Sequence, residues 1–498
     1  MHVGFRVDSS LEIGLGHVSR CLALTNVLTS HNIQVSFISN QLAEHSIQLL
    51  EKLGISRFML DNATSKNQGQ KLKTRSLALD AGDASQTKTI AEDQAMDLLI
   101  VDHYGANSEW FGNLRNRTFR LASICDFPAS EGLDAVIDYG FDASSEKHPL
   151  AKTNQAQLLL GPDFVLINPS SLPERTAQPD SKRRGEVLVA LGSGVSNSQL
   201  MSVASSLSAI KIPNTVRLIV PASKEKTLEA NGIEFTVAPQ SLDKYFDQAV
   251  FCVTAGGLTM YERLARGIPG FTLETADNQS MSLDAARSQG ITETMTIAEA
   301  MQNGKLIEKI SKDIESIDSL TESVLLRSKI DFFGALRTAY VLGLLENTAE
   351  PEIRDINEAD DAILLRWANE EVTRKNSFDR DFIDPESHLL WLGKQLTSGN
   401  PFYIFHLHGI PMGFVRMEND DEVLRLSYGI DLNFRGKGFA KQILKAALTR
   451  ATLPKPLKAR TSARNEASTK ALISVGFKVI TKNEDTIELQ YKPSETFE

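Results

Sequence analysis

The chain has 498 residues, 42% of them apolar, and a formal net charge of −10. This length is sufficient for two or three domains that each bury a core, and the negative charge argues against a general nucleic-acid-binding protein. No apolar run reaches the length of a membrane span, and the first residues lack the apolar segment and cleavage site of a signal peptide. The 3 cysteines are far apart and form neither a zinc pattern nor a disulfide framework, which favours a reducing cytoplasm.

The first part of the chain alternates short apolar runs with helical patterns, such as those at 18–30 and 259–266. The apolar runs are expected to be buried strands of parallel sheets, at 35–38, 98–101, 187–191, 216–220 and 251–254. A polar, proline-containing segment at 168–184 separates two such blocks and is typical of an interdomain linker. We therefore expect an α/β fold with two Rossmann-like halves, residues 1–170 and 185–345.

Beyond residue 347 the pattern changes, which predicts a separate α+β domain over residues 350–498. Helical patterns at 359–371 and 386–398 come first. A hairpin-like unit follows, with strands at 402–407 and 412–417 joined by His408–Pro411. A further strand at 423–430 leads into a glycine-rich loop and another helix.

The opening segment has the features of a site for a phosphate-bearing substrate. A strand runs into a loop with Gly14 and Gly16, which delivers His17 to the start of a helix. Glycines let the backbone approach a ligand, a helix N-terminus attracts negative charge, and a histidine exchanges protons near neutral pH. A histidine taken alone is more often structural than catalytic.

A second candidate segment follows the apolar strand at 98–101. Asp102, His103 and Tyr104 come directly after this run, before Gly105. Ligands of open α/β sheets bind at the carboxyl ends of the strands, where these side chains are expected. The alternative is that Asp102 caps the next helix and Tyr104 packs against that helix.

A third candidate segment starts at Gly256 and Gly257, where a helix is expected to begin. Backbone N–H groups exposed there suit a diphosphate, and Glu262 on the helix could accept hydrogen bonds from ribose hydroxyls. The alternative is an ordinary strand-to-helix turn. The downstream Asn278 and Gln279 make this alternative the weaker one.

Segments 5–20, 102–105 and 256–279 resemble those of the UDP-sugar hydrolases of pseudaminic acid biosynthesis. The resemblance implies a GT-B-like architecture, similar to MurG-type glycosyltransferases, and metal-free release of UDP from UDP-2,4-diacetamido-2,4,6-trideoxy-β-L-altropyranose. It implies that His17 assists water at the anomeric carbon, that Tyr104 positions or activates this water, and that Asn278 holds the sugar or the nucleophile. It also implies a set of substrate-binding residues: Arg6, Asp8, Gly14, Gly16, Gly256, Gly257, Leu258, Glu262 and Gln279. Where the family usually has Gly-Gly-x-Asp, this chain has Gly192–Asn197 with a different sequence.

The glycine-rich loop of the last domain suits a polyanionic ligand such as coenzyme A. Residues 434–440 follow a strand and open a helix, so their backbone N–H groups, with Arg435 and Lys437, could cradle a pyrophosphate. Between Arg435 and Lys482 there are 12 Lys or Arg residues and a single acidic residue, Glu466. A charge-rich region is usually a solvated face, so the loop pattern is the stronger indication.

This domain resembles the GCN5-related N-acetyltransferases, through the loop, 465–468 and 475–477. The resemblance implies acetyl-CoA as cosubstrate, held by Leu432, Arg435, Gly436, Lys437, Gly438, Phe439, Ala440 and Asn465. Segments 366–374 and 388–392 are similar to the branch that acetylates the 4-amino group of a UDP-amino sugar. Where the family often has a tyrosine acid, this chain has Leu472, so Tyr428 or water would have to serve, or the domain is degenerate.

Together the resemblances imply two consecutive activities: acetylation of a UDP-4-amino sugar, then hydrolysis of the product. They imply small-molecule UDP-sugar substrates and neither a nucleic-acid nor a membrane partner. The alternatives are a GT-B glycosyltransferase, a hydrolase for a related legionaminic-type sugar with a degenerate acetyltransferase domain, and a non-catalytic nucleotide-sugar sensor.

Overall fold

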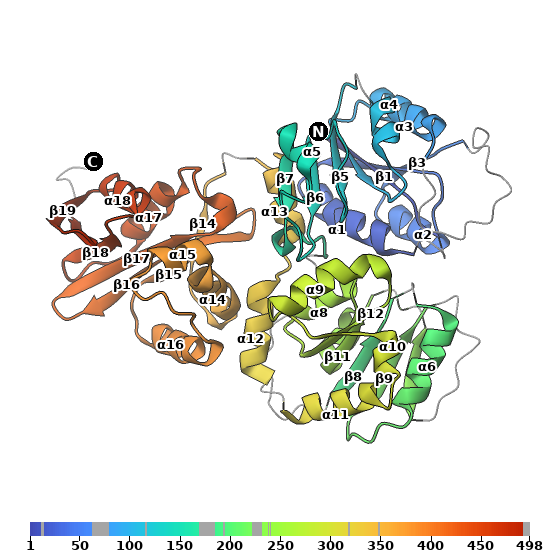
Figure 1. Ribbon diagram of the computed structural model, residues 1–498. Coiled ribbons are helices and arrows are strands. Elements are labelled where there is room, and N and C mark those ends of the chain that lie inside the picture. Colours follow the sequence, from blue (N-terminus) through green and yellow to red (C-terminus); the bar gives the residue numbers. More distant parts are fainter. Residues whose placement is uncertain are drawn as a thin grey trace. The chain divides into compact units, whose positions relative to one another are not determined.

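The chain divides into two compact units, Met1–Leu345 and Glu346–Glu498 (Figure 1). The computed structural model describes residues 1–10, 14–61, 79–114, 117–168, 185–192, 195–221, 232–237, 239, 241–316, 319–346 and 349–491. Residues 169–184 of the linker expected at 168–184, and residues 193–194 of the Gly192–Asn197 loop, lie outside the described residues. Within these ranges no helix combines the length and apolarity needed to span a bilayer.

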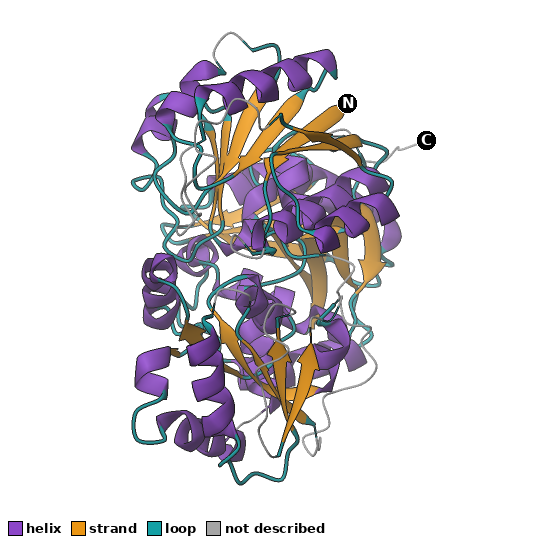
Figure 2. Ribbon diagram, turned by 90° about the vertical axis from the view of Figure 1, so that its right-hand side faces the viewer, coloured by secondary structure: helices purple, strands orange, loops and turns teal. Residues whose placement is uncertain are grey.

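The first sheet of the first unit is parallel and has 7 strands in the order β3-β2-β1-β4-β5-β6-β7. Its strands are β1 (His2–Val7), β2 (Gln34–Ser39), β3 (Ser56–Met59), β4 (Leu98–Asp102), β5 (Arg120–Ile124), β6 (Ala135–Asp138) and β7 (Gln157–Leu160). Its helices are α1 (Gly16–Ser30), α2 (Glu44–Lys52), α3 (Ala81–Asp93), α4 (Ser108–Asn113) and α5 (Pro149–Thr153). Helices flank the strands (Figure 2), which explains why β1 and β4 are buried along their whole length.

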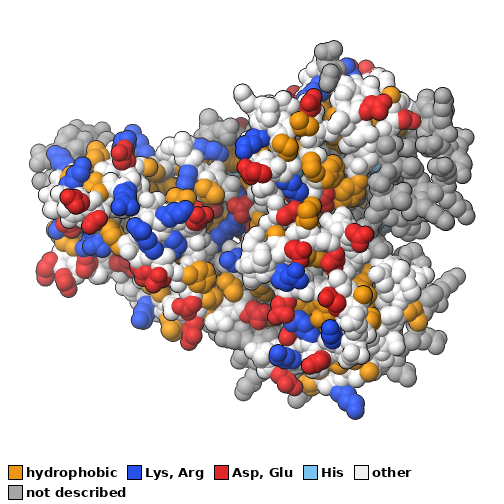
Figure 3. All heavy atoms as spheres, in the orientation of Figure 1, with side chains coloured by type: hydrophobic (Ala, Val, Ile, Leu, Met, Phe, Trp, Pro, Cys, Tyr) orange, Lys and Arg blue, Asp and Glu red, His pale blue; other side chains and the backbone are white. Residues whose placement is uncertain are grey.

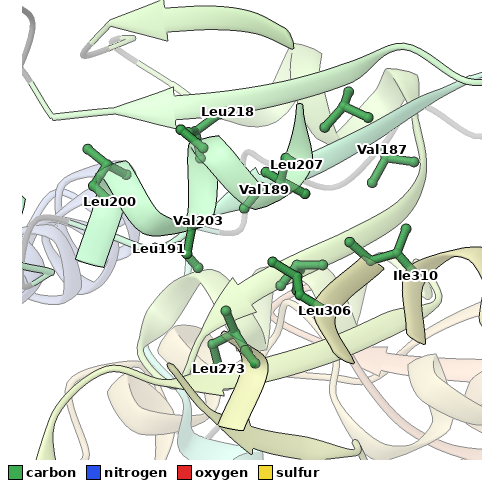
Figure 4. Packing of buried hydrophobic residues seen from close by; sticks show 14 of the residues in the cluster. Val187, Val189, Leu191, Leu200, Val203, Leu207, Leu218, Leu273, Leu306 and Ile310 are labelled. Carbon is green, nitrogen blue, oxygen red and sulfur yellow. The ribbon is translucent and has the colours of Figure 1, made fainter. Parts of the chain in front are cut away.

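The second sheet is also parallel and has 6 strands in the order β10-β9-β8-β11-β12-β13. Its strands are β8 (Glu186–Ala190), β9 (Val216–Val220), β10 (Ile233–Val237), β11 (Ala249–Ala255), β12 (Gly270–Glu274) and β13 (Thr294–Thr296). The helices that follow are α6 (Asn197–Leu207), α7 (Asp243–Gln248), α8 (Leu258–Ala265), α9 (Ser280–Ser288), α10 (Ile297–Ala300), α11 (Lys305–Ser316), α12 (Ser319–Lys329) and α13 (Gly334–Val341). Figure 4 shows its core, where aliphatic side chains of the sheet pack against α6 and α11.

The last helix of the first unit returns to the first sheet. Arg120 donates to the backbone oxygen of Leu342 (2.8 Å), and Gln157 donates to that of Val341 (2.8 Å). Two doubly wound parallel sheets joined in this way make a GT-B-like pair of Rossmann-like domains, as expected from the sequence. The five predicted strands are confirmed: the one at 216–220 coincides with β9, three lie within longer strands, and the one at 187–191 is displaced by one residue from β8.

The second unit has a mixed 7-stranded sheet, and its expected α+β fold is confirmed. The strand order is β14-β15-β16-β17-β18-β20-β19. The strands are β14 (Glu352–Asp355), β15 (Phe402–Leu407), β16 (Ile410–Asp420), β17 (Val423–Ile430), β18 (Leu457–Ser462), β19 (Phe477–Lys482) and β20 (Thr486–Tyr491). The helices are α14 (Asp361–Asn369), α15 (Glu371–Asn376), α16 (Pro385–Thr397), α17 (Phe439–Arg450) and α18 (Glu466–Ile473).

The hairpin turn between β15 and β16 is shorter than predicted. His408 and Gly409 both have positive φ angles, 52° and 78°, which is the conformation of a two-residue type I′ turn. Ile410 and Pro411 therefore belong to β16 and not to the turn.

Two neighbouring parallel strands of this sheet separate. β17 and β18 pair at Leu424–Leu457, Arg425–Lys458 and Leu426–Ala459, and the pairing ends there although both strands continue. The continuation of each strand consequently faces an opening in the sheet.

On the side of the molecule in Figure 3, acidic and basic side chains are interspersed.

Candidate active sites

A buried histidine–aspartate pair lies at the carboxyl end of the first sheet. Residue Val7 of β1 is in register with Asp102 of β4, so the loop after β1 and the end of β4 meet. His17, in the first turn of α1, has its Nδ1 2.6 Å from Oδ1 of Asp102. An ionised carboxylate can only accept, so His17 donates to it from Nδ1, and Nε2 is the acceptor whenever the ring carries a single proton. This is the arrangement of a general base.

Arg20 keeps Asp102 in its ionised form. Its Nε donates to Oδ2 of Asp102 at 2.5 Å, and its NH2 group donates to Oδ1. Burial opposes ionisation of Asp102, but Arg20 and His17 outweigh it and lower the pKa of the carboxyl well below its usual range. Arg20 is itself anchored by a hydrogen bond to the Tyr139 hydroxyl (2.7 Å).

Tyr104 and Asn278 come together beside His17. The rings of Tyr104 and His17 are perpendicular, with centroids 4.9 Å apart. The Tyr104 hydroxyl accepts from Asn278 Nδ2 (3.2 Å) and donates to Asp126 Oδ2 (3.2 Å). Burial, and then Asp126, raise the pKa of Tyr104, so its hydroxyl stays protonated. The three residues expected to be catalytic therefore share one location.

The alternative role of Asp102 as a helix cap is wrong. Helix α4 is capped by Asn107, whose side chain accepts from Trp110 N at 3.0 Å. Asp102 lies within β4 and is committed to His17 and Arg20.

Two helices of this unit begin at the site without a side-chain cap. The N-cap of α1 is Leu15, and that of α8 is Gly257. The first N–H groups of a helix have no acceptor within the helix and attract an anion. Among the described residues, an added Cβ at Gly16 or Gly257 would meet no atom within 4 Å, whereas one at Gly256 would lie 2.9 Å from Leu283. Gly256 therefore allows close packing under α8, and the described part of the chain leaves space for a ligand at Gly16 and Gly257.

Glu262 lies on α8, where burial, and then Asp243, raise the pKa of its carboxyl to about 7 against the influence of Arg266. Gln279, which lies beside Gly256, accepts with its side-chain oxygen from the backbone N–H of Thr275 (3.0 Å). Glu262 is thus a half-buried carboxyl on the same helix whose start could bind a diphosphate.

Arg6 and Asp8 do not face this site, contrary to the expectation that they bind substrate. Arg6 is fully buried and pairs with Asp8 (2.8 Å) and Asp83 (2.5 Å). Asp8 additionally accepts from His103 and from the backbone of Asn40 (2.7 Å). These two residues thus form a buried ionic network with Asp83 and His103 at the end of β1.

The second unit contains a cavity of about 1030 Å³ at the opening between β17 and β18. One wall is aromatic and includes Trp391 and Phe414, with Arg416 5.1 Å from the Trp391 ring. The opposite wall comes from α18 and the loop before α17. The cavity is thus lined both by the separated parts of β17 and β18 and by the helices and the loop around them.

The loop before α17 has the backbone of an anion-binding turn. Gly436 and Gly438 have positive φ angles of 75° and 84°, and an added Cβ at either would meet nothing within 4 Å. The Arg435 side chain differs from the expectation. Its guanidinium donates to Glu370 Oε2 (2.8 Å) and the Ile430 oxygen (2.9 Å), and so anchors the loop to α15.

The other residues expected at this loop divide by burial. The Phe439 side chain is buried against Phe434, whereas Leu432 is 56% exposed. Asn465 caps α18 by accepting from Ser468 N at 3.1 Å and also lines the cavity.

Sequence reasoning missed Arg20, Tyr139 and the pairing of Asp102 with His17. The spacing of His17 and Arg20, three positions apart on one helix, places both on one face and could have indicated a shared partner. Nothing in the sequence signals Tyr139, which follows β6.

Comparisons with known proteins agree with this division of the chain. Residues 352–478 match the acetyltransferase (GNAT) domain family. The chain is 25% identical over 340 residues to the spore coat polysaccharide biosynthesis protein SpsG of Bacillus subtilis, which covers 64% of this chain and 90% of that protein.

Two solved structures are similar to separate portions of the chain. MurG of Acinetobacter baumannii has 12% identity and a TM-score of 0.46, covering 69% of this chain and 99% of its own. The putative acetyltransferase yncA from Salmonella typhimurium, solved with its cofactor acetyl-CoA, has 19% identity and a TM-score of 0.26. The match covers 30% of this chain and 98% of yncA. The sheet topology and the family match together give a unit with a GT-B-like pair of Rossmann-like domains, followed by an acetyltransferase (GNAT) domain.

Proposed function

We propose that the chain is a bifunctional enzyme that acetylates the amino group of a UDP-4-amino sugar and hydrolyses the product to the free sugar and UDP. The observation that carries the hydrolytic part is the His17–Asp102 pair, whose imidazole ring lies edge-on to the ring of Tyr104, the hydrogen-bond partner of Asn278. The GNAT match carries the acetylating part. The printed name of SpsG, a polysaccharide biosynthesis protein, supports a role in sugar metabolism.

In the hydrolytic step, His17 accepts a proton from water at Nε2 as the water oxygen bonds to the anomeric carbon. The bond between that carbon and the diphosphate oxygen breaks, and UDP leaves with the electron pair. Asp102 holds Nδ1 and stabilises the charged ring until the proton passes to solvent. A general base of this kind contributes about 10²–10⁴-fold to the rate.

The surrounding groups bind and orient the substrate. The uncapped start of α8, with Gly256, Gly257 and Leu258, would hold the diphosphate, and Glu262 would accept from the ribose hydroxyls. Asn278 would hold the sugar, and Tyr104 would direct the water toward Nε2 of His17.

In the acetyl transfer, the backbone of the loop 435–440 would hold the pyrophosphate of acetyl-CoA, with Lys437 beside it. Acetyl-CoA supplies an acetyl group as a thioester that an uncharged amine can attack. The aromatic wall with Trp391 and Arg416 would receive the nucleotide-linked acceptor on the other side of the separated strands.

The proposed substrate of the hydrolytic step is UDP-2,4-diacetamido-2,4,6-trideoxy-β-L-altropyranose, by the resemblance of segments 5–20 and 256–279. The test supplies the UDP-4-amino precursor to the full chain with and without acetyl-CoA and follows CoA thiol and UDP. We expect UDP release to require prior acetylation and to collapse in His17→Ala, while CoA release continues in this variant. Normal UDP release by His17→Ala would refute the catalytic assignment, and a glycosylated product in place of free sugar would indicate a glycosyltransferase.

A further inference from the structure

The cavity of the second unit offers few side chains that can give up a proton near neutral pH. Apart from arginines, the titratable side chains among the described residues that line it are His388 and Tyr428. His388 is buried, and its Nε2 is 2.7 Å from the backbone oxygen of Asp361, which uses its N–H group. Leu472, on the α18 wall, is apolar and buried. Tyr428 is left as the proton donor.

The position of Tyr428 follows from the separation of the strands. It lies on β17 two residues beyond Leu426, where pairing with β18 ends. Side chains two apart on a strand share a face, so Tyr428 is on the same face as the buried Leu424 and Leu426. Its hydroxyl interacts with the Ser468 side chain of α18, across the opening.

Tyr428 and helix α18 therefore line the same cavity. Ser468 and Leu472 are one turn apart on α18 and share a helix face. Asn465 fixes the start of this helix by capping the backbone of Ser468. Burial raises the pKa of Tyr428, so the hydroxyl is protonated at neutral pH, and the contact with Ser468 partly offsets this rise.

We propose that Tyr428 is the catalytic acid of the acetyl transfer and protonates the departing sulfur. This inference rests on the proposed acetyltransferase function. The amine nitrogen bonds to the carbonyl carbon, the carbon–sulfur bond breaks with its electron pair on sulfur, and the Tyr428 hydroxyl supplies the proton to sulfur. The amine loses one proton to water, and solvent reprotonates the tyrosine oxygen.

The kinetic test compares Tyr428→Phe with Tyr403→Phe, which removes a hydroxyl from β15 outside this cavity. We expect Tyr428→Phe to lower kcat for CoA release about 10²–10⁴-fold with KM for acetyl-CoA within about threefold of wild type. Tyr403→Phe should retain wild-type kcat. A kcat of Tyr428→Phe within about threefold of wild type would overturn the proposal.

A binding measurement tests the same contact without turnover. Calorimetry with CoA and with desulfo-CoA, which lacks the thiol, isolates the interaction at sulfur. We expect wild type to bind CoA about 3- to 10-fold more tightly than desulfo-CoA, and Tyr428→Phe to bind both equally, because one hydrogen bond is lost. An unchanged preference in Tyr428→Phe would count against Tyr428 at the sulfur. If the chain acetylates no UDP-amino sugar but still prefers CoA to desulfo-CoA, and loses this preference in Tyr428→Phe, the proposed acceptor is refuted. The contact of Tyr428 with the sulfur is then supported.

Discussion

Replacement of Asp102 by asparagine tests whether the orientation and tautomer of the His17 ring matter, because the histidine itself stays in place. The asparagine side chain has the shape of the aspartate but no charge, and it presents an N–H₂ group to one of two donors, His17 Nδ1 or Arg20. His17 then accepts at Nδ1 and carries its proton on Nε2, which is the wrong form for a base. Arg20, partly buried beside it, loses the carboxylate with which it pairs.

The expected effect on catalysis is large and specific. We expect kcat for UDP release to fall about 10²–10⁴-fold, the range for a general base, with KM for the UDP-sugar within about threefold of wild type. Because breaking a buried charge pair costs about 3–5 kcal/mol, the free energy of unfolding should also fall. The assay is UDP release at a temperature where denaturation curves show the variant to be folded.

Asp331→Asn is a matched control. Asp331 pairs with the buried Arg337 at 2.7 and 2.6 Å, remote in sequence from the catalytic residues, so its loss should lower stability but not kcat. ¹⁵N NMR of labelled histidine gives a direct check, because His17 should change from the Nδ1–H to the Nε2–H tautomer only in Asp102→Asn. A folded Asp102→Asn protein with kcat within about threefold of wild type would refute the reasoning.

Three further predictions concern the neighbouring groups. Tyr139→Phe removes the anchor of Arg20 and should lower kcat for UDP release about tenfold at unchanged KM; an unaltered kcat would contradict a positioning role. The folded pKa of Glu262 is about 7, above the unfolded value of 4.5, so its ionisation lowers stability as pH rises between these values. Glu262→Gln should therefore raise the free energy of unfolding by about 1–3 kcal/mol at about pH 8, and not at about pH 4. The same variant should bind UDP more weakly. Equal stability of the variant and the wild type at about pH 8 would exclude a raised pKa of Glu262. Gly438→Ala, at a φ of 84°, should destabilise the second unit by about 1–2 kcal/mol and weaken CoA binding measured by calorimetry; unchanged affinity would exclude the loop.

The sequence is informative where one local pattern determines the structure. Continuous apolar runs predict parallel strands such as β4 and β8 because both faces of such sheets are covered. The glycines before α8 and α17 predict the helix starts. These features depend on neighbouring residues and on a single element.

Contacts between distant elements are harder to predict. His17 and Asp102 are 85 residues apart, and they meet because β1 lies beside β4 in a specific register. Arg6 stands in a motif that suggests binding, and only the position of Asp83 on α3 shows that its charge is neutralised inside the protein. The separation of β17 from β18 likewise follows from pairing and not from composition.

The central claim is that His17 activates water at the anomeric carbon of a sugar that the same chain has acetylated. The most direct measurement is turnover of the UDP-4-amino sugar and acetyl-CoA by the full chain in H₂¹⁸O, followed by mass spectrometry of both products. We expect one ¹⁸O in the free diacetamido sugar, none in UDP, and no label transfer in His17→Ala. Label in UDP would place the cleavage at phosphorus, and labelled sugar from His17→Ala would remove the histidine from the reaction.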